Sequence, residues 1–154
     1  MMPKKNSGRL LVILASAAIL LAGWRLGGES HQARVTARFE ADRPALEELA
    51  LTVLEQGSVE NIPIPNGWKG IELYGGYSGP QVVEFSFGCS GFGSPTAYWG
   101  VNYVPDDRPL GFQGDVWDYW KARGEGRLYY EPEGDNTCYV QRLASCWYYY
   151  EARF

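Results

Sequence analysis

The sequence has 154 residues, 45% of them apolar, which is enough for one folded domain and one additional segment. Its formal net charge is −4, and the only charges before residue 29 are Lys4, Lys5, Arg9 and Arg25. Removing these four from the 14 basic residues leaves 10 against 18 acidic residues, a net charge of −8 for the remainder. Because phosphate binding requires clustered Lys and Arg, we expect no nucleic-acid partner and no adsorption to anionic lipid.

The N-terminal part combines a basic tail, residues 1–9, with an apolar segment, residues 10–26, of sequence LLVILASAAILLAGWRL. Its uncharged part would span about 22 Å as a helix, against a hydrocarbon core of roughly 30 Å, and the long side chains of Arg9 and Arg25 would make up the difference. Basic residues before the span place the N-terminus in the cytoplasm. We therefore expect a single-pass signal-anchor helix in a cell membrane of bacterial type, with an extracytoplasmic C-terminal domain.

The alternative is a cleaved signal peptide, which would release the domain as a secreted protein. Signal peptidase prefers small residues at positions −3 and −1 of its site. The triplets that end at Gly23 and Gly27 begin with Leu21 and Arg25, so they fit this preference badly. The retained anchor is therefore favoured.

Beyond the span, residues 27–41 are expected to form a joint and a weakly amphipathic helical linker, and residues 42–154 the extracytoplasmic domain. Asp42 is a suitable N-cap, with Pro44 in the first turn, and Gly57 suits the C-terminal end. The apolar residues between them follow the spacing i, i+3, i+4, i+7 and i+8: Leu46, Leu49, Ala50, Val53 and Leu54. This spacing predicts a helix that packs on a sheet.

After Gly57 the apolar period changes from 3.6 to 2, which is typical of strands. The candidate strands are residues 69–74, 82–89, 97–104, 127–131, 137–142 and 146–154. Gly, Pro, Asn and Asp mark the junctions, and the connections are too short for helical crossovers between parallel strands. We predict an α+β domain with one or two helices followed by a five- to six-stranded antiparallel β-meander.

The chain is rich in aromatic residues, with 11 Tyr and 6 Trp. In the last candidate strand, Tyr148 and Tyr150 share one face, which we assign to the core, and two aromatic residues share the other. A second aromatic group follows the long loop 105–116. If exposed, Tyr and Trp are typical anchors of binding surfaces. On that condition, the candidate binding residues are Trp117, Tyr119, Trp120, Trp147 and Tyr149.

Three cysteines allow at most one intramolecular disulfide, which is expected to form outside the cytoplasm. Cys138 and Cys146 are close in sequence and are the candidate pair, whereas Cys89 fits a buried small side chain. A zinc site is not expected, because the cysteines are scattered and His31 is the only histidine. We expect no metal and no cofactor.

The sequence shows no catalytic signature. Ser90 lies in GCSGFGS, but Phe92 stands where a nucleophile elbow requires Gly. The acidic clusters at residues 106–118 and 131–135 do not match a calcium-binding loop, and solvated turns account for them. We therefore expect no enzymatic activity.

The leading hypothesis is a non-enzymatic, membrane-anchored interaction domain whose partner is a protein, such as an envelope complex or a toxin neutralised by an immunity-type protein. The alternative is a cell-wall glycan-binding module that uses exposed Trp and Tyr. A small hydrolase with paired carboxylates ranks third, because chance pairing is easy in an acidic domain.

Overall fold

The computed structural model describes residues 30–75, 80–91, 96–114 and 118–154. The chain divides into two units, Met1–Ser30 and His31–Phe154. The predicted signal-anchor segment, residues 10–26, lies outside the described residues. Among the helices that the structure describes, none has the length and apolar character that crossing a membrane requires.

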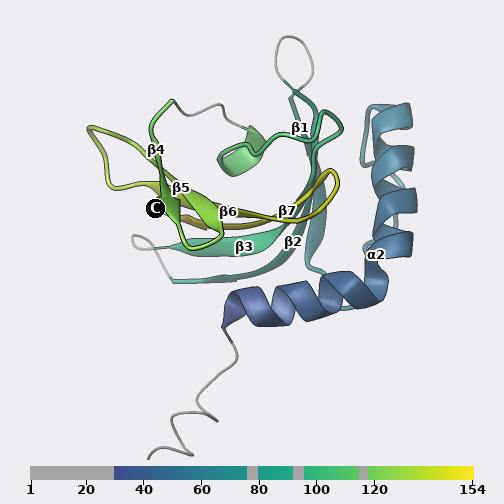
Figure 1. The fold of residues 1–154 in the computed structure, drawn as a ribbon. Coiled ribbons are helices and arrows are strands. Elements are labelled where there is room, and N and C mark those ends of the chain that lie inside the picture. Colours follow the sequence, from purple (N-terminus) through teal and green to yellow (C-terminus); the bar gives the residue numbers. More distant parts are fainter. Residues whose placement is uncertain (1–29, 76–79, 92–95, 115–117) are drawn as a thin grey trace, which may run out of the picture. The chain divides into compact units, whose positions relative to one another are not determined.

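The unit His31–Phe154 begins with one long helix, α2 (His31–Gln56), which contains Pro44. The prediction that a helix begins at an Asp42 cap is therefore wrong. Proline lacks the N–H that would bond to the fourth preceding carbonyl, and such a gap bends a helix. Figure 1 shows α2 as two limbs joined by a bend. Both limbs bury apolar residues, Val35 and Phe39 before Pro44 and Leu46 after it, so packing holds the helix together across the break.

Asp42 has a different role from the one predicted. Its Oδ2 accepts hydrogen bonds from Arg38 Nε at 2.5 Å and from Trp68 Nε1 at 2.9 Å. Arg38 also donates to the carbonyl oxygen of Asn66. Asp42 thus ties α2 to the segment that leads into the sheet.

In the described residues, seven antiparallel strands form one open sheet in the order β1-β2-β3-β7-β6-β5-β4. Their bounds are β1 (Gly70–Tyr74), β2 (Val82–Ser90), β3 (Ala97–Tyr103), β4 (Trp120–Arg123), β5 (Gly126–Tyr130), β6 (Thr137–Ala144) and β7 (Trp147–Arg153). The α+β class is confirmed, but the sheet is larger than predicted and is not a simple meander. β3 pairs with the last strand, β7, so two meanders join in the middle of the sheet. The strand missing from the prediction is β4, whose four exposed residues show no alternation.

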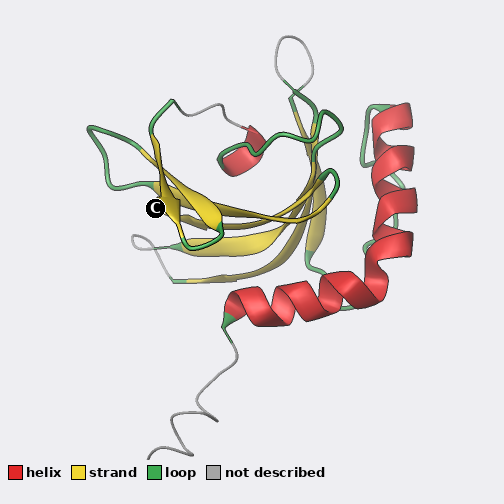
Figure 2. Ribbon diagram, in the orientation of Figure 1, coloured by secondary structure: helices red, strands yellow, loops and turns green. Residues whose placement is uncertain are grey.

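The middle of the sheet is covered on both faces (Figure 2). Helix α2 lies on the outer, convex side, where it contacts β2, β3 and β7. The inner side carries the segment after β3 with the short 3-10 helix η1 (Phe112–Gly114). The outer core includes Phe39, Phe85, Val101, Trp147 and Tyr149. The inner core includes Val82, Leu110, Cys138, Tyr148 and Tyr150.

Candidate functional site

The structure separates the five predicted binding residues. Tyr119 is 54% exposed and Trp120 is 45% exposed. Trp147 and Tyr149 are 0% exposed, because α2 covers the face of β7 on which they lie. Their prediction as surface anchors is therefore corrected: both belong to the outer core. Trp117 lies outside the described residues.

Tyr119 and Trp120 lie at the end strand of the sheet. β4 pairs with β5 on one side only among the described residues, and all four of its residues are exposed. The two strands are joined by a two-residue turn at Gly124 and Glu125, and Gly124 has φ +56°. This conformation suits glycine at the first turn position, so the local sequence favours a tight hairpin. The hairpin holds both aromatic residues at the open edge.

Three cations of this hairpin lie over aromatic rings. Arg127 lies 4.3 Å from the ring centroid of Trp120, Lys121 lies 5.7 Å from that of Tyr130, and Arg123 lies 5.8 Å from that of Tyr139. None of the three forms an ion pair with a carboxylate of the described residues. We name Tyr119, Trp120, Lys121, Arg123 and Arg127 the basic–aromatic edge. It is a positively charged site in a domain of net negative charge.

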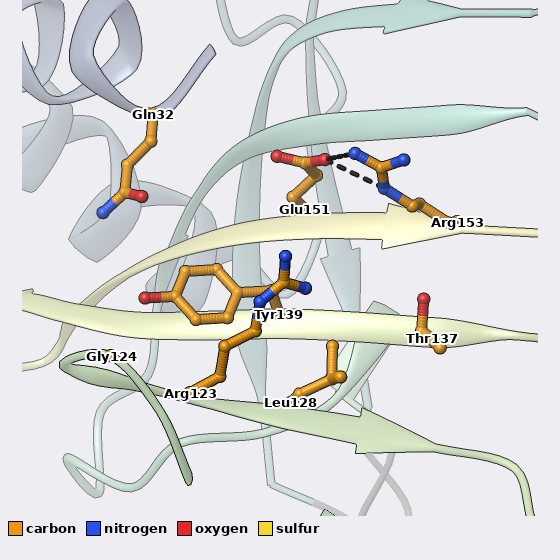
Figure 3. Close-up of a pocket in the computed structure, with 8 residues that line it drawn as sticks. All are labelled: Gln32, Arg123, Gly124, Leu128, Thr137, Tyr139, Glu151 and Arg153. Atoms are coloured by element: carbon orange, nitrogen blue, oxygen red, sulfur yellow. Dashed lines mark hydrogen bonds and ion pairs between the residues drawn. The ribbon is translucent and has the colours of Figure 1, made fainter. Parts of the chain in front are cut away.

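A pocket of about 340 Å³ adjoins this edge on the outer side of the sheet (Figure 3). Its lining comes from the start of α2, from the β4–β5 hairpin, and from β6 and β7. The lining residues are Gln32, Arg123, Gly124, Leu128, Thr137, Tyr139, Glu151 and Arg153. Strands that are distant in sequence supply these groups, so no local pattern could have predicted them together.

The two arginines of the pocket are held differently. Arg153 Nε donates to Glu151 Oε1 at 3.0 Å and forms an ion pair with it, so this guanidinium is largely engaged (Figure 3). Arg123 lies over Tyr139, and burial raises the pKa of the Tyr139 hydroxyl, while the charge of Arg123 opposes that shift. Since cation–aromatic contact leaves the N–H groups of Arg123 free to bond elsewhere, Arg123 can take up a carboxylate.

The only carboxylate in the lining of this pocket, Glu151, also accepts the hydroxyl of Tyr149 at 3.0 Å. The pair of carboxylates that a glycoside hydrolase requires is therefore not assembled there. Elsewhere, Glu131 and Glu133 line a shallow hollow with Tyr119, and Glu131 accepts a hydrogen bond from Asn136 at 2.9 Å.

The acidic cluster after β3 has a structural role in the described part of the chain. Asp106 pairs with Arg108 at 2.8 Å, and Asp107 pairs with Arg142. Asp107 Oδ1 also accepts the backbone N–H of Cys146 at 2.7 Å and the hydroxyl of Tyr148 at 3.0 Å. The N–H of Cys146 is the main reason why the pKa of Asp107 is lowered. The carboxylate thus fastens the segment after β3 to the β6–β7 turn.

A buried polar pair lies in the inner core. Glu84 is 5% exposed, and its Oε1 accepts the hydroxyl of Tyr150 at 2.8 Å. Burial, with a smaller contribution from Glu72 on the neighbouring strand, raises the pKa of Glu84 from its ordinary value of 4.5 to about 7. Glu84 Oε2 and the Oδ1 of its register partner Asn102 have no hydrogen-bond partner in the described residues. Because Glu84 and Asn102 are both buried, they affect the stability of the domain and form no surface site.

The predicted disulfide between Cys138 and Cys146 is absent, and all three cysteines are free thiols. Cys138 pairs with Ala152 near one end of the β6–β7 hairpin, whereas Cys146 lies in the turn at the other end. Six residues along a strand separate these levels by roughly 20 Å, far beyond the limit of about 7 Å between Cα atoms. The eight positions that separate the two cysteines in sequence run along the length of the hairpin, so closeness in sequence does not bring the thiols together.

The structure also describes the three other side chains that the sequence offered for catalysis or metal binding, His31, Cys89 and Ser90. The ring of His31 stacks on Trp99 with centroids 3.7 Å apart, and its Nδ1 lies 2.9 Å from Arg34 Nη2. Ser90 ends β2 after a register shift between Ser86 and Gly88. Cys89 is exposed, so its interpretation as a buried small side chain is wrong. No group of three or more His, Cys, Asp or Glu side chains in the described ranges is arranged to hold a metal ion.

Comparison with known proteins gives no relative: no protein family, curated protein or solved structure matches this chain.

Proposed function

We propose that this protein is a non-enzymatic binding domain, displayed on the outer face of a bacterial membrane by residues 10–26, whose partner is a protein. The observation that carries the proposal is the basic–aromatic edge. Of the large apolar side chains that the structure describes, Tyr119 and Trp120 are the adjacent exposed pair. They lie among three cations that form no ion pair with a carboxylate in the described part of the chain. Exposed Tyr, Trp and Arg are the residue types that dominate binding energy at protein interfaces.

Charge supports a protein partner with acidic groups. The cations of the edge contrast with the net charge of −8 beyond residue 28, so they attract a negatively charged surface while the rest of the domain repels it. Such an arrangement fixes the orientation of a partner more than it raises affinity. The edge is therefore suited to specific docking in one orientation.

The proposal is tested by photocrosslinking the full-length protein in intact membranes. A photoreactive residue at position 119 should give an adduct with one protein, and Trp120→Ala should reduce its yield. Leu51 is the matched control, since it is 52% exposed and lies on α2. An adduct of equal yield from position 51, or no adduct from position 119, would reject the edge as a protein-binding site.

A second candidate function, glycan binding, is favoured by the pocket in Figure 3. It combines the guanidinium of Arg123 with the ring of Tyr139 and the hydroxyl of Thr137, groups that suit an acidic sugar. Cosedimentation of the full-length protein with purified cell wall tests this function. Binding that Arg123→Ala abolishes would support the glycan, whereas no cosedimentation would reject it.

A further inference from the structure

The open side of β4 presents backbone groups in addition to side chains. The N–H of Tyr130 donates to the carbonyl of Tyr119 at 3.2 Å, just before the register pairs of β4 and β5. In an antiparallel ladder, hydrogen-bonded and non-hydrogen-bonded pairs alternate. The pairs at Lys121 and Arg123 are therefore hydrogen-bonded. Trp120 and Ala122, between them, turn their N–H and C=O groups away from β5 toward the open side.

Edge strands with unpaired backbone groups bind further strands unless something covers them. No described segment pairs with this side of β4, and the strand is exposed along its whole length. Two outward residues offer two donors and two acceptors, which is enough to fix the register of one short extended segment. The backbone geometry thus provides a docking edge.

The side chains select what docks there. Lys121 and Arg123 lie on the face that carries the pocket, with Leu128 opposite Lys121. Trp120 and Ala122 alternate with them and lie on the other face, beside Arg127. An added strand alternates in the same way, so every second side chain would lie next to a cation and the others next to the Trp120 ring.

We propose that β4 binds an extended acidic segment of the protein partner as an eighth strand, with carboxylates at alternate positions beside Lys121 and Arg123 and an apolar side chain between them beside Trp120. This inference rests on the proposed function, since it assumes that the basic–aromatic edge is the protein-binding site, and it adds the conformation and the sequence pattern of the partner.

A second copy of the chain is a poorer occupant of this edge. Antiparallel pairing of β4 with β4 would bring Lys121 and Arg123 of both copies together, and like charges directly opposite each other destabilise a sheet. Pairing of β4 with the other end strand, β1, would leave an open edge on each copy and continue without closure. An acidic segment of another protein avoids both difficulties.

The experiment measures binding of two labelled seven-residue peptides to full-length protein in detergent micelles. In the first peptide Glu and Val alternate, and in the second the same residues are segregated into a Glu block and a Val block. We expect the alternating peptide to bind at least several-fold more tightly than the segregated one, and we expect added salt to weaken its binding. Equal affinity for the two peptides would overturn strand addition, because bulk charge would then explain the binding.

Two variants of Ala122 test the backbone contribution. Ala122→Pro removes the N–H that points outward without removing a bond to β5, a position where edge strands tolerate proline. We expect this variant to bind the alternating peptide about tenfold more weakly, which corresponds to the free energy of one to two hydrogen bonds. Ala122→Val keeps the N–H and should bind like the wild type. Equal binding by both variants would overturn the proposal.

Hydrogen exchange gives a readout that needs no variant. Saturation with the alternating peptide should protect the amides of Trp120 and Ala122, which are open in the free protein, more than those of β1. Unchanged exchange at both amides would overturn the proposal even if Ala122→Pro failed to fold. If the crosslink at position 119 forms while these amides stay unprotected, the edge binds a protein by another geometry. If the crosslink also fails, the proposed function falls with the inference.

Discussion

Glu84 is a carboxyl group enclosed in the inner core, and its pKa of about 7 couples the stability of the domain to pH. The folded protein holds the proton more tightly than the unfolded chain does. The stabilising contribution is therefore fully present below about pH 4.5 and is lost as the pH rises through 7. Because the side chain is almost fully buried, the shift corresponds to roughly 3 kcal/mol.

We therefore predict that Glu84→Gln removes this dependence. Glutamine keeps an acceptor for the Tyr150 hydroxyl and carries no charge at any pH. The free energy of unfolding is measured by urea titrations at pH 5 and at pH 8. It should be lower at pH 8 than at pH 5 in the wild type, and the difference should be much smaller in the variant. The exposed helix residue Glu55 provides the control, and Glu55→Gln should follow the wild type. An identical pH dependence of wild type and Glu84→Gln would contradict the role of Glu84.

The cysteines allow a second prediction at this scale. Cys89 is exposed, whereas Cys138 is buried and burial strongly raises the pKa of its thiol. Since the thiolate is the reactive form, Cys89 should react with a thiol reagent in the native protein and Cys138 only after unfolding. Quantification in denaturant without reductant should give three free thiols per chain. A value near one would restore the disulfide between Cys138 and Cys146.

At the scale of elements, the centre of the sheet depends on one close approach between strands. Gly100 lies on β3 between β2 and β7, and a Cβ there would lie 2.2 Å from the carbonyl oxygen of Phe85 and 3.0 Å from the ring of Tyr150. Only a shift of the backbone could relieve the first contact. The glycine at this position thus permits the close approach of β2 and β3.

Gly100→Ala is therefore expected to destabilise the domain by about 1–3 kcal/mol, the usual cost of an overpacked core. Gly134→Ala is the comparison, because the three atoms nearest to a Cβ there all belong to the side chain of Glu131. Thermal unfolding followed by circular dichroism measures both. A melting temperature for Gly100→Ala as high as that of Gly134→Ala would show that β2 and β3 yield more easily than their geometry indicates.

The elements also show where sequence periodicity fails. Asp42 and Pro44 are ordinary signals for the start of a helix, yet α2 continues through them because both of its limbs are packed against the sheet. β4 has no apolar alternation because no layer covers it, so pattern alone gave no sign of the strand that ends the sheet. In both cases tertiary contacts, or their absence, overrode the local pattern.

At the scale of the whole molecule, the unit His31–Phe154 holds buried clusters on both faces of its sheet. About 124 residues around such a core are enough for an independent domain. We predict that residues 31–154, expressed alone, unfold in one cooperative transition. Coincident urea curves from tryptophan fluorescence and far-ultraviolet circular dichroism would support this. Separate transitions would show that the core needs the preceding residues.

Several features of this protein follow from its sequence alone. Alternation of apolar residues placed β2, β3, β5, β6 and β7 close to their observed bounds, and turn residues between them indicated an antiparallel sheet. Alternation defines the two faces of a strand, but it cannot say whether one face or both are covered. That is why Trp147 and Tyr149, predicted as surface anchors, were found in the outer core.

The order of the strands, and with it the candidate site, depends on tertiary contacts that no local sequence pattern specifies. The pairing of β3 with β7 sets β4 at the end of the sheet and brings Arg123 and Tyr139 to one pocket with Gln32 from α2. Contacts of this kind join residues far apart along the chain, so they depend on the packing of helix and loops against a curved sheet. Residue type and spacing thus indicated the strands and the aromatic content, whereas the folding of the chain exposes Tyr119 and Trp120 to solvent among three cations.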